Sequence, residues 1–166
     1  MTHDLKALME LEKRLVEAKG WDREIDVLLW AELDGRDVRY DGDKVLAKSR
    51  KPPHDECLLG FIDPGKVSRN FSAADGHRPV IDTVTASLDA AVALVERVLP
   101  GWWWKMEANG GQSKDLQFYT ARVYTVEKIG GDADNLKERY AAAPQITPAL
   151  ALCLAAVRAL ISQGEQ

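Results

Sequence analysis

The segment GWWWKMEANGGQSKDLQFYTARVYTVEK, residues 101–128, holds two apolar-rich runs on either side of a polar, glycine-containing stretch. The outer runs are typical of β-strands, and the NGGQSKD stretch between them is typical of a hairpin loop. Successive side chains of a strand point to opposite faces of a sheet, so Trp102 and Trp104 point one way and Trp103 points the other. The segment therefore predicts an antiparallel hairpin with indole rings on both faces.

The two faces of this predicted hairpin differ in polarity. The apolar face is expected to be core and carries Trp102, Trp104 and Met106 of the first strand and Tyr119, Ala121 and Val123 of the second. The other face mixes aromatic and charged groups, and its candidate binding residues are Trp103, Lys105, Arg122 and Tyr124. An aromatic ring beside two cations suits an anionic or nucleotide-like ligand, or a partner protein. The alternative is that a helix of the same chain covers this face and the two cations reach out at the edges of that helix.

Three further segments have the apolar spacing of amphipathic helices. They are residues 4–19, the stretch from Asp22 to Gly35 and the stretch from Ser87 to Leu99. Asp22 and Ser87 are favourable N-cap residues because their side chains accept hydrogen bonds from free backbone N–H groups in the first turn. Asp26 lies off the apolar stripe of its helix, so we expect its carboxylate to be solvated.

The segment from Thr147 to Ser162 predicts a helix that is buried nearly all round. Thr147 is its N-cap, and Pro148 takes the first helical position, where a missing N–H has no cost. Arg158 is the one charged residue between Pro148 and Ile161. A sheet can cover one side of such a helix, and the other side needs a second helix or a second subunit. This apolar surface predicts a homodimer or a higher homo-oligomer.

The remaining segments have weaker patterns. VRYDGDKVL at 38–46 predicts a hairpin, and CLLGFI at 57–62 and VIDTVTA at 80–86 predict strands. Residues 130–145 predict a connection with one helical turn. Together these elements predict an α+β fold, an α/β sandwich whose helices cover a small, mostly antiparallel sheet with a Trp-rich hairpin, with residues 1–166 in a single domain.

The composition restricts the partners and the location that we expect. The 166 residues carry a net charge of −4, so general attraction to nucleic acid or to an anionic membrane is not expected. No apolar run reaches the about 20 residues of a membrane-spanning helix, and the charged N-terminal segment lacks the apolar core of a signal peptide. These features predict a cytoplasmic protein.

The residues that could support catalysis or metal binding do not form a recognised set. Cys57 and Cys153 lie in apolar segments and are expected to be reduced, packed thiols. With three scattered histidines they lack the spacing of a zinc site, so we expect no metal and no cofactor. His54, Asp75 and His77 could serve a small hydrolase, but loop residues without separate supporting elements do not set the geometry of a triad. We assign no catalytic residue.

Three stretches resemble a family of small phage and prophage proteins, the phage α/β/α sandwich domain. They are DREIDVLLWAEL at 22–33, TASLDAAVALVERVLPGWWW at 85–104 and TPALALCLAAVRAL at 147–160. The resemblance covers roughly half of the chain, and it implies a phage or prophage origin and a compact mixed fold. It supplies no catalytic residues. Residues 36–80 and 130–145 fall outside it, and we expect a function particular to this protein to lie there.

These features favour a non-enzymatic phage or prophage accessory protein that binds a host or phage partner. One form of this hypothesis is an anti-defence factor that inhibits a host protein or sequesters a nucleotide signal. A structural or assembly role in the virion is the alternative, and a small hydrolase is a further one. The missing catalytic set and the mixed aromatic and cationic face motivate the first hypothesis.

Overall fold

A computed structural model describes residues 4–61, 81–109, 118–128, 136–145 and 147–164. These residues form four helices and two antiparallel sheets of three strands each, which confirms the predicted α+β class. In chain order the elements are α1 (Leu5–Glu17), α2 (Arg23–Leu33), β1 (Arg36–Asp41), β2 (Lys44–Ser49), β3 (Glu56–Phe61), α3 (Leu88–Val98), β4 (Trp103–Asn109), β5 (Phe118–Lys128), β6 (Leu136–Gln145) and α4 (Pro148–Gly164).

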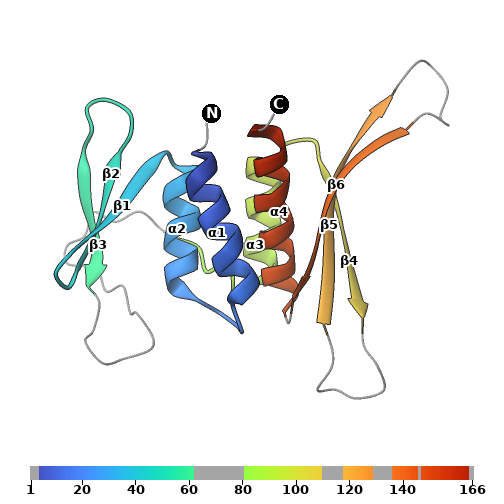
Figure 1. The fold of residues 1–166 in the computed structure, drawn as a ribbon, viewed down its shortest axis with the longest axis horizontal. Coiled ribbons are helices and arrows are strands. Elements are labelled where there is room, and N and C mark those ends of the chain that lie inside the picture. Colours follow the sequence, from blue (N-terminus) through green and yellow to red (C-terminus); the bar gives the residue numbers. More distant parts are fainter. Residues whose placement is uncertain (1–3, 62–80, 110–117, 129–135, 146, 165–166) are drawn as a thin grey trace.

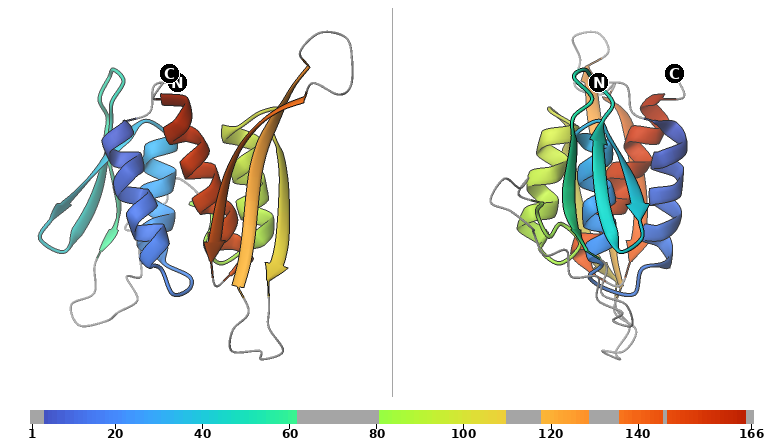
Figure 2. Two further views of the ribbon diagram at one scale, coloured as in Figure 1. Left: turned by 45° about the vertical axis from the view of Figure 1, so that its right-hand side comes forward. Right: turned by 90° about the vertical axis from the view of Figure 1, so that its left-hand side faces the viewer.

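The four helices lie between the two sheets (Figures 1 and 2). Sheet A, with strand order β1-β2-β3, packs on α2 at one end of the molecule, and sheet B, with strand order β4-β5-β6, packs on α4 at the other end. Helix α1 joins the two halves because it contacts both α2 and α4. Each sheet therefore has described helices on one face only, whereas the sequence predicted a single sheet.

Helix α4 is the centre of the main hydrophobic core. It contacts β5, β6, α3 and α1, and every residue from Ala149 to Val157 is buried. The same core takes Leu8, Leu11 and Leu15 from α1 and Ala121 and Val123 from β5. The second side of α4 is thus covered within the chain. The apolar surface that motivated a homo-oligomer from this helix is accounted for by α1 and α3.

A smaller core lies between α2 and sheet A. Val27 of α2 contacts a cluster that contains Val45, Ala47 and Leu59 from the strands. Burying a valine or leucine side chain, such as that of Val27, stabilises the fold by about 1.5–3 kcal/mol. Helix α2 faces the main core with Ile25 and the sheet A core with Val27, which explains why most of its residues are buried.

The local signals for helices and turns are confirmed. Asp22 accepts hydrogen bonds from the N–H groups of two first-turn residues, and Ser87 and Thr147 each accept one. The predicted Asp-Gly hairpin is β1–β2, with Gly42 at a φ of 61° in its two-residue turn. A positive φ at the first turn position favours glycine because other residues are strained there.

Two predictions about strands are wrong. Residues 80–86 were expected to form a strand, but the described part of that segment, 81–86, is irregular and contains a turn. Residues 130–145 were expected to form a connection, but residues 136–145 are strand β6, which pairs with β5 along its whole length. The long neighbouring strand imposes this conformation, because a chain beside an open sheet edge gains a full ladder of backbone hydrogen bonds.

Asp26 corrects a third prediction. Its carboxylate is buried rather than solvated and is 1% exposed. Thr85, from the segment before α3, donates two hydrogen bonds to it, and Trp21 donates a third from its indole N–H. These donors come from outside the helix, so the helical pattern of α2 does not reveal them.

Candidate binding face of sheet B

Strand pairing brings the four predicted site residues together. Trp103 of β4 lies directly opposite Tyr124 of β5, and Lys105 lies directly opposite Arg122. Side chains of directly opposed residues share one face of an antiparallel sheet, about 4.5–5.5 Å apart at Cβ. The neighbouring positions Ala121 and Val123 are fully buried against the helices, so the four site residues belong to the face turned away from them.

We call this surface the outer face of sheet B. Its described members are Trp103, Lys105, Glu107 and Asn109 of β4 and Phe118, Thr120, Arg122 and Tyr124 of β5. Trp103 is 65% exposed, so the alternative in which a helix of the same chain covers it is wrong. Phe118, which is also exposed, marks the opposite end of the face. Sequence reasoning missed Phe118, although strand alternation back from Arg122 would have placed it there.

Trp102 and Trp104, the other two tryptophans of the hairpin segment, were both predicted to lie in the core, and the structure places only one of them there. Trp102 is half-buried and packs against the main core, as expected, but it lies in the turn before β4. Trp104 was expected in the core and is instead 38% exposed. Helix α4 packs on β5 and β6, so β4 at the edge of the sheet receives less cover.

Glu107 organises the charges of the outer face. Its carboxylate lies 2.7 Å from the ammonium of Lys105 and 3.6 Å from the guanidinium of Arg122. The hydrogen bond from Lys105 and the two positive charges hold the pKa of Glu107 below its ordinary value. The described side chains of β4 and β5 on this face therefore present two cations and one carboxylate between an aromatic pair at one end and Phe118 at the other.

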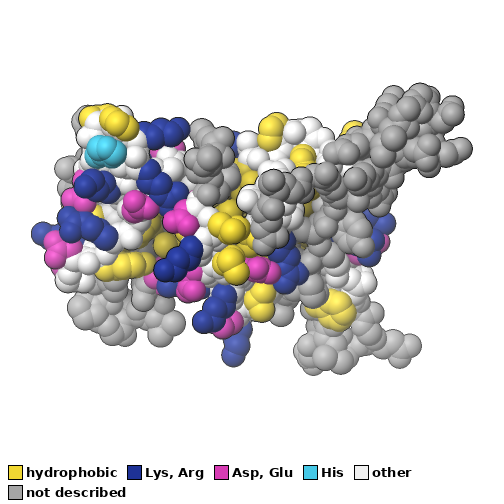
Figure 3. All heavy atoms as spheres, turned by 45° about the horizontal axis from the view of Figure 1, so that its top comes forward, with side chains coloured by type: hydrophobic (Ala, Val, Ile, Leu, Met, Phe, Trp, Pro, Cys, Tyr) yellow, Lys and Arg dark blue, Asp and Glu magenta, His cyan; other side chains and the backbone are white. Residues whose placement is uncertain are grey.

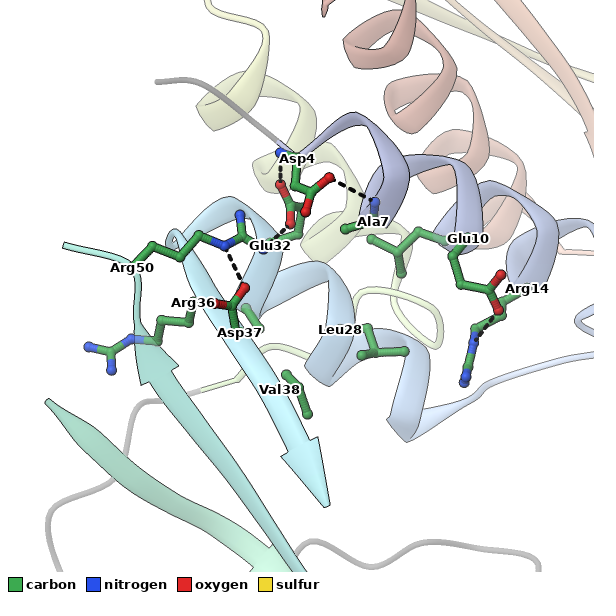
Figure 4. Close-up of a pocket in the computed structure, with 12 residues that line it drawn as sticks. Asp4, Ala7, Glu10, Arg14, Leu28, Glu32, Arg36, Asp37, Val38 and Arg50 are labelled. Carbon is green, nitrogen blue, oxygen red and sulfur yellow. Dashed lines mark hydrogen bonds and ion pairs between the residues drawn. The ribbon is translucent and has the colours of Figure 1, made fainter. Parts of the chain in front are cut away.

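A cavity of about 230 Å³ lies elsewhere, between α1, α2 and sheet A (Figure 4). Leu28 and Val38 line its apolar part, and Arg14 and Glu10 lie at the α1 end, 3.4 Å apart. Sites for small ligands usually have about 300–1,000 Å³. No sequence motif indicated this cavity, because its walls come from separate elements.

The charged groups at the other end of the cavity bind one another. Arg50 lies 2.6 Å from Glu32 and 2.7 Å from Asp37, and the N–H of Asp4 donates to Glu32. The hydrogen bond that Arg50 donates to the Glu32 carboxylate raises the pKa of Arg50 above its ordinary value. Figure 3 shows acidic and basic side chains interspersed over this end of the molecule. The network thus joins α1, α2 and sheet A, and we regard it as structural.

The candidate catalytic residues do not form a site in the described part of the chain. His54 is exposed in the turn between β2 and β3, where its Nδ1 atom lies 3.2 Å from the carbonyl oxygen of Ser49. Asp75 and His77 lie outside the described residues. Both cysteines are free thiols. Among the described residues, no three His, Cys, Asp or Glu side chains are grouped to hold a metal ion.

Comparisons with known proteins give no match: no family model, no curated protein and no solved structure is similar to this chain. None of the described helices has the length and apolar character needed to cross a membrane. The functional argument therefore rests on the residues of the outer face.

Proposed function

We propose that this protein is a non-enzymatic binding protein that holds a partner protein on the outer face of sheet B. The observation that carries this proposal is the exposure of Trp103 beside Tyr124 and Arg122. Tryptophan, tyrosine and arginine are the residue types that most often dominate protein interfaces. An indole that is 65% exposed leaves apolar area in water that a partner can cover.

The shape and charge of the face favour a protein over a small ligand. A small molecule needs a concave site that buries most of its surface, and the one cavity described above lies away from this face. Among the described side chains of this face, Lys105 and Arg122 outnumber Glu107, so the complementary partner surface carries carboxylates beside apolar side chains. Sequestration of a nucleotide signal is correspondingly less favoured.

The resemblance to phage α/β/α sandwich proteins gives this proposal its biological setting. In that setting the partner is a host or phage protein in the cytoplasm, and inhibition of a host defence protein is the form that we favour. A role in virion assembly would use the same kind of surface, with a virion protein as the partner.

A double substitution tests the proposal. The wild type and Trp103→Ala/Arg122→Ala are immobilised, exposed to host lysate and compared by mass spectrometry, and binding to each captured protein is then measured with purified material. We expect one partner whose affinity falls about a hundredfold or more in the double variant, because each lost anchor costs about 1–2 kcal/mol or more.

A matched control lies on sheet A. Tyr40→Ala/Arg39→Ala also removes an exposed aromatic ring and a cation, but from the other end of the molecule. This control should bind the partner as the wild type does, and circular dichroism should show both variants folded. Equal binding by all three proteins would overturn the proposal. A thermal shift produced by nucleotides or cyclic dinucleotides would point instead to a signal-binding role.

A further inference from the structure

Strand β4 is an edge of sheet B with aromatic side chains exposed on both of its faces. Among the described strands it pairs with β5 alone. Trp103 is 65% exposed on the outer face, and Trp104 is 38% exposed on the opposite face. A further strand laid against this edge would cover part of both indoles and satisfy the free backbone groups of β4.

The other fully described edge strand is protected against such pairing. Strand β1 carries four charged residues among its six, Arg36, Asp37, Arg39 and Asp41. Charges along an edge oppose the addition of another strand. Strand β4 has only two charged residues, Lys105 and Glu107, and they have opposite signs.

The order of these two charges makes β4 complementary to itself. When two copies of β4 run antiparallel with Met106 opposite Met106, Lys105 of each copy faces Glu107 of the other. Trp104 then faces the second copy's Ala108, which leaves room for the indole, and Trp103 faces the second copy's Asn109. Directly opposed residues of unlike charge stabilise antiparallel strands.

Neighbouring registers lack this complementarity. A shift of two residues in one direction places Lys105 opposite Lys105, and a shift of two in the other direction places Glu107 opposite Glu107. Shifts by one residue join the outer face of one copy to the helix-covered face of the other. The charge pattern therefore selects the register centred on Met106.

We infer that a second copy of this chain binds along β4, so that two sheets B join into one continuous six-stranded antiparallel sheet. The contact is two-fold symmetric, which closes the assembly at a dimer. Both outer faces lie on the same side of the joined sheet. This inference does not rest on the proposed function, although the dimer would present the partner-binding face twice.

Charge reversal at β4 tests the inference by light scattering and sedimentation. The wild type should have twice the 18.4 kDa mass of one chain at high micromolar concentration. Lys105→Glu places like charges opposite each other at both symmetric positions, and so does Glu107→Lys. Each single variant should raise the dimer dissociation constant about tenfold or more. Lys13→Glu, an exposed change on α1, is the control that should leave the dimer intact.

Two combinations separate this contact from general loss of fold. Lys105→Glu/Glu107→Lys restores unlike pairs and should dimerise like the wild type. A mixture of the two single variants should form a heterodimer that neither forms alone, because one copy is acidic and the other basic at both positions. A wild-type protein that stays monomeric at high micromolar concentration would overturn the inference, and so would charge variants that dimerise unchanged.

Cysteine cross-linking tests the register. In a Cys57→Ser background, Met106→Cys should form a disulfide between two copies under mild oxidation, since the two residues 106 face each other. Ala108→Cys, at an exposed position two residues along the strand, should form no such disulfide. In this register residue 108 faces residue 104 of the second copy, and the two residues 108 lie too far apart to be bridged. Efficient cross-linking through residue 108 and not 106 would exclude the register centred on Met106. These readouts are independent of partner capture, so the dimer and the proposed function can fail separately.

Discussion

Asp26 of α2 accepts two hydrogen bonds from Thr85, one from the backbone N–H and one from the hydroxyl group, each 2.9 Å long. The two residues are 59 positions apart in the sequence. Trp21 adds a third hydrogen bond of 3.1 Å. This carboxylate therefore attaches the turn before α3 to the start of α2, and it connects the chain segments on either side of sheet A.

Removal of the carboxylate should destabilise the fold strongly. In Asp26→Ala the buried N–H and hydroxyl of Thr85 lose their acceptor, so we expect the free energy of unfolding to fall by about 2–4 kcal/mol. Urea denaturation measures this change. Asp82→Ala, an exposed carboxylate in the same region, is the control and should stay within about 0.5 kcal/mol of the wild type.

The same carboxylate should make stability depend on pH in an unusual direction. Burial raises the pKa of Asp26 above its ordinary value of 3.8, although the hydrogen bonds from Thr85 oppose this effect. The folded state therefore holds the proton to higher pH than the unfolded state, and the free energy of unfolding from this group falls as pH rises through the folded pKa. In Asp26→Asn the side chain at position 26 has no proton to titrate, so this contribution to the pH dependence is absent.

The measurement compares wild type and Asp26→Asn by urea denaturation at about pH 4 and about pH 7. The free energy of unfolding of the wild type, relative to the variant, should be greater at the lower pH. The comparison cancels the titration of other carboxylates, which both proteins share. If the free energies of unfolding of wild type and Asp26→Asn differed by the same amount at both pH values, burial would not raise the pKa of Asp26.

The helices and the hairpin could be predicted because their signals are local. Ser87 and Thr147 cap helices within three residues of themselves, and the alternation around Trp103 places Lys105 on its face. The burial of Asp26 could not be predicted, because its partner Thr85 lies in another segment. The same contact explains the missing strand at 81–86, since the N–H and hydroxyl of Thr85 bind a helix carboxylate instead of a neighbouring strand.

Val95 tests the packing of α3. Its side chain is fully buried in the main core, as the helical stripe predicted. Val95→Asp would place an unpaired carboxylate among apolar side chains, and the free energy of unfolding should fall by about 3 kcal/mol or more. Thermal denaturation measures the loss. Glu96→Asp, on the exposed side of the same helix, should have almost no effect.

Removing one partner of the buried ion pair beside the cavity should lower the free energy of unfolding far more than removing one partner of an exposed ion pair. The side chain of Glu32 is only 2% exposed, so Arg50→Ala leaves a buried carboxylate without its 2.6 Å partner and should cost about 3 kcal/mol. Arg39→Ala removes the same type of side chain from Glu56 in an exposed ion pair, where solvent screens the charges, so this variant should lose far less stability than Arg50→Ala. Equal losses in the two variants, measured in urea, would contradict this account.

The two thiols should differ sharply in reactivity. Burial, and the nearby charge of Asp26, raise the pKa of Cys153, which is fully enclosed. Burial also raises the pKa of Cys57, but this residue is only partly covered. Iodoacetamide should therefore label Cys57 slowly in the native protein and both cysteines in urea, as counted by mass spectrometry. Rapid labelling of Cys153 without urea would show that the main core opens.

The exposure of Trp104 could not be predicted from alternation alone. Alternation assigns a side chain to a face, but cover depends on where the helices lie across the sheet. Helix α4 lies on β5 and β6, and β6 itself was missed because LKERYAAAPQ lacks the β-branched residues typical of strands. The sequence does not fix the order of the strands, so the edge position of β4 could not be predicted from it.

The central place of α4 has a consequence for the order in which the chain can fold during synthesis. Arg158 pairs with Glu12 across 146 positions, and Gln145, just before the helix, donates a hydrogen bond to the carbonyl oxygen of Leu15 across 130 positions. Residues 148–164 are translated after every element against which they pack. Until they leave the ribosome, the apolar faces of α1, α3 and sheet B have nothing between them. The main core therefore cannot be completed until residues 148–164 have been synthesised.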